Sequence, residues 1–322
     1  MERSLRTLLT GIVDYAGLFP PAELPLEEAI REYAGTQTGP AAWLLSRFVC
    51  PADRLSDFGP LGDKAFTADK PARLTVLGRE DPLTPEFIKD VRLADYFAKT
   101  HGERCQIEAL ELRVPGDKLR DWTPEAVSEG LDVLATRLLE HHFADAEVFL
   151  EPIFVGEYRE SLARTIAALQ FHDEQRGRPA PARIGLKLRT GGVQATAFPP
   201  LERVAHTLIA CRDGCVPLKF TAGLHHPLRH FDAGLQTDMH GFINVFTGAV
   251  LAHARGLNEE TLTQLLAEQD AAAFTFTAEG FQWREWSATI DEIELARREF
   301  ALSFGSCSLN EPQEGLSTLG LM

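Results

Sequence analysis

Two lysines lie inside short apolar runs, and their side chains are suited to nucleophilic chemistry. Lys187 belongs to RIGLKLRTGG (residues 183–192) and Lys219 to CVPLKFTAG (residues 215–223). A lysine that is removed from water beside a second cation has a lowered pKa, which frees a neutral amine to attack a carbonyl carbon. The pair therefore indicates Schiff-base chemistry, with Lys187 as the leading catalytic residue.

Other charged residues lie in or at the ends of similar runs, where an unpaired charge is costly. Strand residues two apart face the same side. Hence Glu111 shares a face with Arg113, and Lys187 with Arg189. One interpretation is a set of internal ion pairs, such as Glu151 with Lys187, that only stabilises the fold. The other is a positive site for a carboxylate, phosphate or enolate, which arginine can bind in a bidentate manner. In that case we expect catalytic carboxylates at Asp14, Glu111 and Glu151, and substrate contacts from Arg47, Arg113, Arg189, Thr190 and Thr221.

Histidines cluster in LHHPLRH after the second lysine run. His225 is a candidate general acid or base, and His226 a candidate substrate contact. His226 and His230 are four residues apart, so on a helix they could share a face and bind zinc. We expect no metal, and a divalent metal such as zinc at His226 and His230 is the alternative.

Eight apolar runs alternate with amphipathic segments, a pattern typical of parallel strands joined by helices. The runs are residues 10–13, 41–49, 72–78, 107–114, 146–154, 183–192, 215–223 and an eighth, for which 272–277 and 242–250 compete. Alternating Phe and Thr favour 272–277, so we expect a helix over 241–255 and a last helix over 289–305. The sequence predicts a (β/α)8 barrel, with an open doubly wound sheet as the alternative. In such a barrel the catalytic groups lie at the carboxyl ends of the strands.

KLRTG (187–191) and KFTAG (219–223) resemble the lysine segments on strands six and seven of class I aldolases of the deoxyribose-phosphate aldolase type. Those enzymes also carry an aspartate on the first strand, a position that Asp14 matches. The resemblance covers about ten of the 322 residues. It implies Lys187 as the Schiff-base amine, Lys219 as the group that lowers its pKa and Asp14 as a proton shuttle. Arg189 replaces a small polar residue of the family pattern, which indicates an acid substrate rather than a sugar phosphate. HHPLRH has no counterpart there.

The amino-acid composition limits the kinds of molecule that this protein can bind. The net charge of −15 disfavours a nucleic-acid backbone or an anionic membrane, and 44% hydrophobic residues exclude a disordered chain. The acidic residues fall mostly on the expected helices, so the predicted site has the opposite sign. Five scattered cysteines and a broken apolar N-terminus predict reduced thiols and a cytoplasmic location.

We expect one domain over residues 1–322 with a C-terminal tail from about 305. Phe19, Pro20 and Pro21 should cap the mouth after the first strand. Cys307 is more simply a half-buried cysteine than a reactive thiol. The apolar end of the tail could dock on another subunit, so a homo-oligomer stays open.

The sequence thus predicts an enzyme that acts on a small anionic carbonyl or hydroxy-acid metabolite by lyase or enolising chemistry. Two alternatives remain. One is a metal-dependent lyase, isomerase or hydrolase that uses His225, His226 or His230. The other is a non-catalytic anion-binding module. The identity of the substrate is beyond the sequence.

Overall fold

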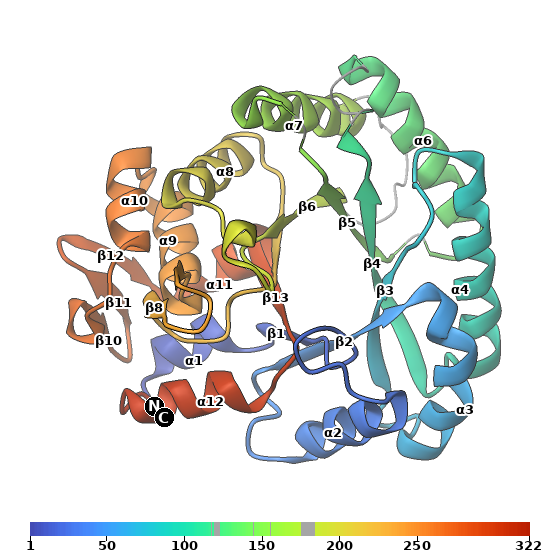
Figure 1. The fold of residues 1–322 in the computed structure, drawn as a ribbon, viewed down its shortest axis with the longest axis horizontal. Coiled ribbons are helices and arrows are strands. Elements are labelled where there is room, and N and C mark those ends of the chain that lie inside the picture. The colour runs from blue at the N-terminus through green and yellow to red at the C-terminus, as the bar shows by residue number, and fades with distance from the viewer. Residues whose placement is uncertain (117, 119–122, 144, 155, 175–183) are drawn as a thin grey trace.

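A closed barrel of eight parallel strands forms the centre of the molecule (Figure 1), in a computed structural model that describes residues 1–116, 118, 123–143, 145–154, 156–174 and 184–322. The strands follow the order β1-β13-β7-β6-β5-β4-β3-β2, and β1 pairs with both β2 and β13. They are β1 (Val13–Tyr15), β2 (Leu45–Pro51), β3 (Ala72–Leu77), β4 (Cys105–Val114), β5 (Glu147–Pro152), β6 (Ile184–Arg189), β7 (Leu218–Thr221) and β13 (Ala301–Ser306). The predicted (β/α)8 barrel is confirmed, and the closed order excludes an open sheet.

Helices surround the barrel (Figure 1). Their starts carry the signals that the sequence contains: Thr123 accepts a hydrogen bond from the Ala126 amide at the start of α6, and Thr289 and Glu292 form a capping box at α11. The helices are α1 (Arg3–Leu9), α2 (Leu26–Thr38), α3 (Leu55–Ala65), α4 (Ile88–His101), α6 (Pro124–Glu140), α7 (Tyr158–Glu174), α8 (Leu201–Asp213), α9 (Phe242–Arg255), α10 (Glu259–Leu266), α11 (Ile290–Glu299) and α12 (Asn310–Thr318). No helix within the described ranges has the length and apolar character needed to cross a membrane.

The eighth barrel strand is neither of the two segments that the sequence favoured. The helix expected over 241–255 is present as α9 (Phe242–Arg255). The barrel closes through β13 (Ala301–Ser306), which overlaps the end of the predicted last helix over 289–305. Ala296, Phe300 and Phe304 recur at intervals of four, a helical spacing that hides the change of structure. The Arg297 guanidinium donates to the carbonyl oxygens of Ala301 and Leu302, which fixes the tight turn from α11 into β13.

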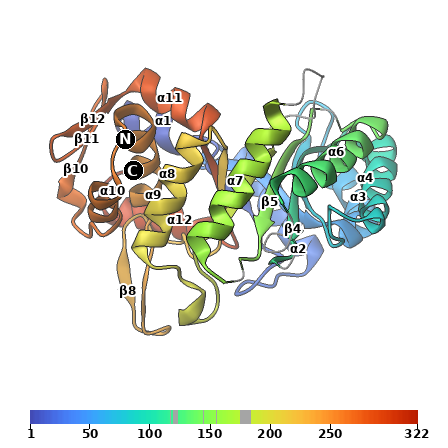
Figure 2. The ribbon, with the colours of Figure 1, turned by 90° about the horizontal axis from the view of Figure 1, so that it is seen from above.

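Residues 274–276 do form a strand, but outside the barrel. This strand, β10 (Phe274–Phe276), joins β11 (Gly280–Trp283) and β12 (Trp286–Thr289) in a small antiparallel sheet. A second antiparallel pair, β8 (His230–Asp232) and β9 (Thr237–Met239), follows β7, and Figure 2 shows its ribbon projecting beyond the helices. The strict Phe/Thr alternation fits a strand with one exposed face, which a barrel strand covered by helices lacks.

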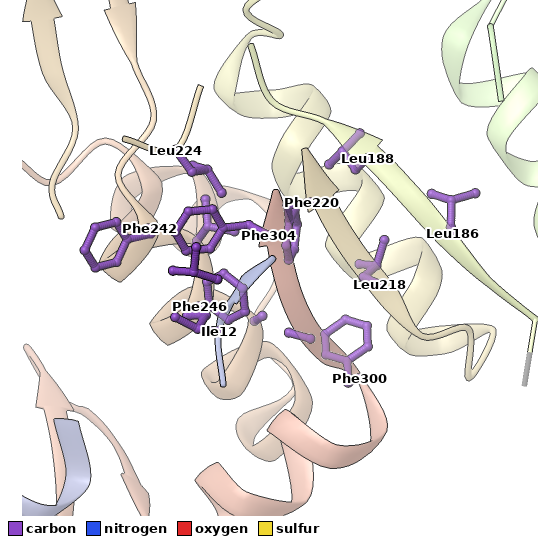
Figure 3. Packing of buried hydrophobic residues seen from close by; sticks show 14 of the residues in the cluster. Ile12, Leu186, Leu188, Leu218, Phe220, Leu224, Phe242, Phe246, Phe300 and Phe304 are labelled. Atoms are coloured by element: carbon purple, nitrogen blue, oxygen red, sulfur yellow. The ribbon is translucent and has the colours of Figure 1, made fainter. Parts of the chain in front are cut away.

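Alternation along β6 and β7 separates an apolar outer face from a polar inner face. Phe220 points outward and packs against Phe246 of α9, with ring centroids 5.3 Å apart, in the cluster of Figure 3. Phe242 of α9 stacks on Phe304 of β13 at 5.7 Å. Because successive strand residues point to opposite faces, the outward packing of Phe220 directs its neighbour Lys219 into the barrel. Lys187 follows the same rule, between the outward Leu186 and Leu188 (Figure 3).

One glycine makes room inside the barrel. A Cβ at Gly185 would lie 2.7 Å from the Pro217 carbonyl oxygen and 2.9 Å from the Phe149 ring. The absent side chain lets the Phe149 ring lie within the barrel, where the Lys219 ammonium sits 5.6 Å from its centroid. This ring helps to separate Lys219 from water.

Candidate active site

A cavity of about 280 Å³ opens at the carboxyl ends of the barrel strands. This is the end at which barrel enzymes place their chemistry. Lys187 is one of the side chains that line the cavity, whereas Lys219 is fully buried beneath it. The lining residues are Ala16, Phe19, Pro20, Pro21, Val49, Leu77, Glu111, Arg113, Lys187, Arg189, Gly192, Val193, Thr221, Ala222, Gly223, His225, Gly305 and Cys307.

Two carboxylates hold the ammonium group of Lys187. The Lys187 Nζ atom lies 2.6 Å from Glu111 Oε2 on β4 and 2.8 Å from Glu151 Oε2 on β5. All three side chains are at least nine-tenths buried. The anticipated ion pair between Glu151 and Lys187 is therefore present, at the edge of the cavity.

Lys219 forms a second bridged pair deeper in the barrel. It is in register with Lys187 on the neighbouring strand. Its Nζ atom lies 2.7 Å from Asp14 Oδ2, and it also contacts Glu111 Oε1. Glu111 thus bridges both lysines. The structure therefore brings together four of the six residues expected to be catalytic, namely Asp14 of β1, Glu111 of β4, Lys187 of β6 and Lys219 of β7.

The buried charges form a row in which negative and positive groups alternate and stabilise one another: Glu151, Lys187, Glu111, Lys219 and Asp14. Burial alone would raise the pKa of Glu111, but the ammonium groups of Lys187 and Lys219 lower it to about 2. Asp14 behaves in the same way: burial raises its pKa, and Lys219 and Arg47 outweigh that effect. Burial lowers the pKa of Lys219, and its two carboxylate partners raise it above the ordinary value. Lys219 therefore remains a cation. The ammonium groups of the two lysines, which were expected from the sequence to act directly on each other, have a carboxylate between them.

The rim of the cavity is richer in cations than in carboxylates. Glu151 Oε1 accepts from Arg189 Nη2 at 2.9 Å, and Arg113 Nε lies 4.0 Å from Glu151 Oε2. Glu151 is therefore shared by Lys187, Arg189 and Arg113, and these cations together lower its pKa against the effect of burial. The two arginine side chains are 43% and 57% exposed, so their guanidinium groups keep donors directed to solvent. An incoming anion can use those donors.

His225 lies beside this cavity with one nitrogen engaged. Its Nδ1 atom is 2.8 Å from Glu311 Oε2, a residue of α12. The hydrogen bond lowers the pKa of Glu311. Pairing at Nδ1 orients the ring and leaves Nε2 for a substrate, as in other carboxylate–histidine pairs. The tail helix therefore contributes to the site, a role that the sequence gave no sign of.

The remaining predicted contacts divide into two groups. Thr221 lines the cavity. Thr190 is fully buried, and its hydroxyl donates to the carbonyl oxygens of Thr221 and Ala222 at 3.2 and 2.5 Å, so it supports the loop after β7. His226 and His230 lie outside the lining, with ring centroids 4.3 Å apart.

Arg47 does not belong to the cavity. It is the third residue of β2, at the amino end of the barrel, where its guanidinium lies 2.9 Å from Glu108 and 2.6 Å from Glu147. It borders a different hollow that also carries Asp145. The placement of Arg47 at the mouth was therefore wrong, because it lies too early in its strand to reach the carboxyl end. Its main-chain amide instead donates to Asp14 Oδ1 at 3.0 Å.

Several residues of the site have no signal in the sequence that would have identified them. Ser303 of β13 donates to Asp14, and it was hidden in a predicted helix. Val49, near the end of β2, and Leu77, the last residue of β3, line the cavity, although nothing in the sequence distinguishes them from core residues. Phe19, Pro20 and Pro21 line it as their position after β1 predicted. Cys307 also lines the cavity, with a buried thiol whose pKa is raised by burial.

No group of three histidine, cysteine, aspartate or glutamate side chains in the described ranges could hold a metal ion. The alternative at His226 and His230 therefore lacks a third ligand among those residues. Comparisons with models of protein families and with curated proteins found no match to this chain.

Proposed function

We propose that this protein is an enzyme that forms an imine between Lys187 and a small anionic carbonyl compound, for aldolase-like cleavage or for enolisation. The single observation that carries the proposal is the position of the Lys187 ammonium at the cavity, between two ionised carboxylates. Lys219 is too deeply buried to meet a substrate. Only one of the two lysines thus combines a reactive group with access.

Proton transfer to a carboxylate prepares Lys187 for attack. Glu111, with a pKa of about 2, stays ionised, so we assign the transient acceptance of this proton to Glu151, whose Oε2 atom lies 2.8 Å from Nζ. The neutral amine attacks the carbonyl carbon and a C–N bond forms; the oxygen leaves as water with one proton from the amine and the one held by Glu151. The resulting iminium accepts the electron pair of a Cα–Cβ or Cα–H bond, which leaves an enamine. In cleavage the β-hydroxyl gives its proton to a base and the Cβ fragment departs as a carbonyl compound, and in enolisation the Cα proton passes to the base.

Lys219 acts on this sequence through Glu111. Its ammonium contacts Glu111 and lies 2.7 Å from Asp14, so a permanent cation stands behind the bridging carboxylate. That cation keeps Glu111 ionised and holds its carboxylate in place beside Lys187. Asp14 keeps Lys219 in position and is the inner end of the row.

The charged residues at the rim of the cavity would recognise the substrate. Arg113 and Arg189 share Glu151 with Lys187, so a substrate carboxylate meets more positive than negative charge there. His225, held by Glu311, is placed to exchange a proton with the outer part of the substrate. The carbonyl group would then lie inward, over Lys187.

Borohydride trapping tests the proposal. The protein is mixed with a panel of 2-oxo acids, reduced with borohydride, and its intact mass is measured. We expect one adduct per chain, absent from Lys187→Ala and present in the matched control Lys64→Ala, an exposed lysine on α3. Binding of the panel without an adduct would favour an anion-binding module and overturn the proposal. An adduct that persists in Lys187→Ala would also overturn it.

A further inference from the structure

The cavity has two walls of different chemistry. One wall is apolar and comprises Ala16, Phe19, Pro20, Pro21, Val49 and Leu77. The other carries the charged and polar groups Glu111, Arg113, Lys187, Arg189 and His225. None of the lining residues on the first wall is ionisable or bears a hydrogen-bonding side chain.

Barrel topology assigns each wall to its own arc of strands. The apolar residues lie in the last part of β2, at the end of β3 or after β1, and these three strands are adjacent in the barrel. The polar residues come from β4, β6 and the segment after β7, and the two arcs meet where Leu77 of β3 is in register with Glu111 of β4. Between β1 and β7 stands β13, whose end supplies only Gly305 and Cys307. A ligand over Lys187 therefore has guanidinium groups on one side and hydrocarbon on the other.

This division restricts what the substrate carries beyond its carbonyl group. With the carbonyl carbon at Lys187 and the carboxylate at Arg113 and Arg189, the remaining substituent extends toward the apolar wall. A phosphate or a second carboxylate there would lose its water without gaining a cation, which is strongly unfavourable. An alkyl or aromatic group would instead bury apolar area.

We propose that the substrate is amphipathic: a 2-oxo acid with an apolar side chain, or the aldol formed from such an acid. This inference depends on the proposed function, because it takes Lys187 as the anchor of the carbonyl group. The cavity of about 280 Å³ is near the lower limit of ligand sites, about 300 Å³, so the substituent is short. The apolar wall discriminates against sugar phosphates.

A homologous series measures the contribution of this wall. Adduct formation at Lys187 is titrated with pyruvate, 2-oxobutanoate, 2-oxopentanoate and 2-oxohexanoate, followed by reduction and mass measurement. Each buried methylene contributes about 0.8 kcal/mol, so the half-saturating concentration should fall about fourfold per added carbon until the cavity is full. The matched charged probe is 2-oxoglutarate, which has the five-carbon chain of 2-oxopentanoate and should bind more weakly.

Substitutions at Leu77 assign the effect to the apolar wall. Leu77→Asn places an amide of similar size at the end of β3 and should flatten the series, so that the ratio of the half-saturating concentrations of pyruvate and 2-oxopentanoate falls toward one. Leu77→Met keeps the hydrocarbon and should retain the slope. Thermal unfolding of both variants checks that each is folded.

The outcomes separate this inference from the function on which it depends. If none of the oxo acids gives an adduct at Lys187, the proposed function fails and the inference fails with it. If pyruvate is trapped but the series is flat, the proposed function stands and the amphipathic substrate is overturned. Tighter binding of 2-oxoglutarate than of 2-oxopentanoate would overturn it as well.

Discussion

The two ends of the barrel carry the same residue types in opposite balance. At the amino end, Arg47 is held by both Glu108 and Glu147, and Arg73 lies 2.7 Å from Glu108. Two arginines are matched there by two carboxylates, and burial of Arg47 is compensated by these ion pairs. The hollow beside Arg47 also contains Asp145, so it does not attract an anion.

At the carboxyl end the balance is reversed. Three carboxylates, Asp14, Glu111 and Glu151, face four cations beside an open cavity: Lys187, Lys219, Arg113 and Arg189. A charged residue in a barrel strand therefore indicates function only when its ion-pair partners are taken into account. Cations that are each paired with a carboxylate stabilise the fold, whereas cations that outnumber the carboxylates beside a cavity can bind an anionic ligand.

The largest expected difference between the two ends is in stability. Glu111→Gln leaves two buried ammonium groups short of a counter-charge and should lower the free energy of unfolding by about 3–5 kcal/mol. Glu108→Gln removes a partly exposed partner at the amino end and should cost about 0–1 kcal/mol. Urea unfolding of both variants measures the contrast, and equal losses would contradict it.

Acid should act mainly on the carboxyl end. The pKa of Glu111 lies at about 2, below the ordinary 4.5, so its contribution is complete above about pH 4.5 and is lost as the pH falls toward 2. That shift corresponds to about 3 kcal/mol. Unfolding followed by circular dichroism from pH 6 to pH 2 should show this decline. The decline should be shallower in Glu111→Gln, and an unchanged slope would argue against an ionised Glu111.

Ligand affinity should distinguish Arg189 from Arg47. Arg189→Gln removes a rim cation and should weaken oxo-acid binding by about 1.5–3 kcal/mol, which is roughly 10- to 150-fold. Arg47→Gln should leave that affinity unchanged, because its guanidinium lies at the other end of the barrel. Titration calorimetry measures both. A large loss of affinity in Arg47→Gln alone would reverse the assignment of the two ends.

The smallest expected effect concerns the tail. His225 lowers the pKa of Glu311, so His225→Asn should return that pKa toward the ordinary carboxyl range. Because Glu311 is 45% exposed, the cost in stability should be only about 0.2–1 kcal/mol, present above about pH 4.5. Carbon-13 NMR of the Glu311 carboxyl, assigned with Glu311→Gln, reports the shift. An unaltered pKa would mean that the pair contributes nothing to the orientation of His225.

The barrel and most of the buried row of charges could be predicted from the sequence. The alternation of apolar runs with amphipathic segments indicates the barrel, and charged residues within the apolar runs indicate the row. Lys187, Lys219, Glu111 and Glu151 stand out as charges in otherwise apolar runs, and a closed barrel with parallel strands brings such positions together. The eighth strand could not be predicted, since the four-residue spacing of Phe300 and Phe304 continues the pattern of α11.

Position along a strand was the other missing information. Arg47 and Arg189 look alike in sequence, but Arg47 lies early in β2 and Arg189 ends β6. Strand boundaries decide which end of the barrel a side chain reaches, and they are the least certain feature of a single sequence. Glu311 and Ser303 depend on long-range contacts, to His225 and Asp14, which no local pattern encodes.

In the proposed reaction Lys187, and not the fully buried Lys219, is the reactive amine. Peptide mapping of the reduced oxo-acid adduct tests it most directly. We expect the modification on the peptide that contains Lys187, with Lys219 unmodified. An adduct on Lys219, or adducts spread over exposed lysines, would contradict it.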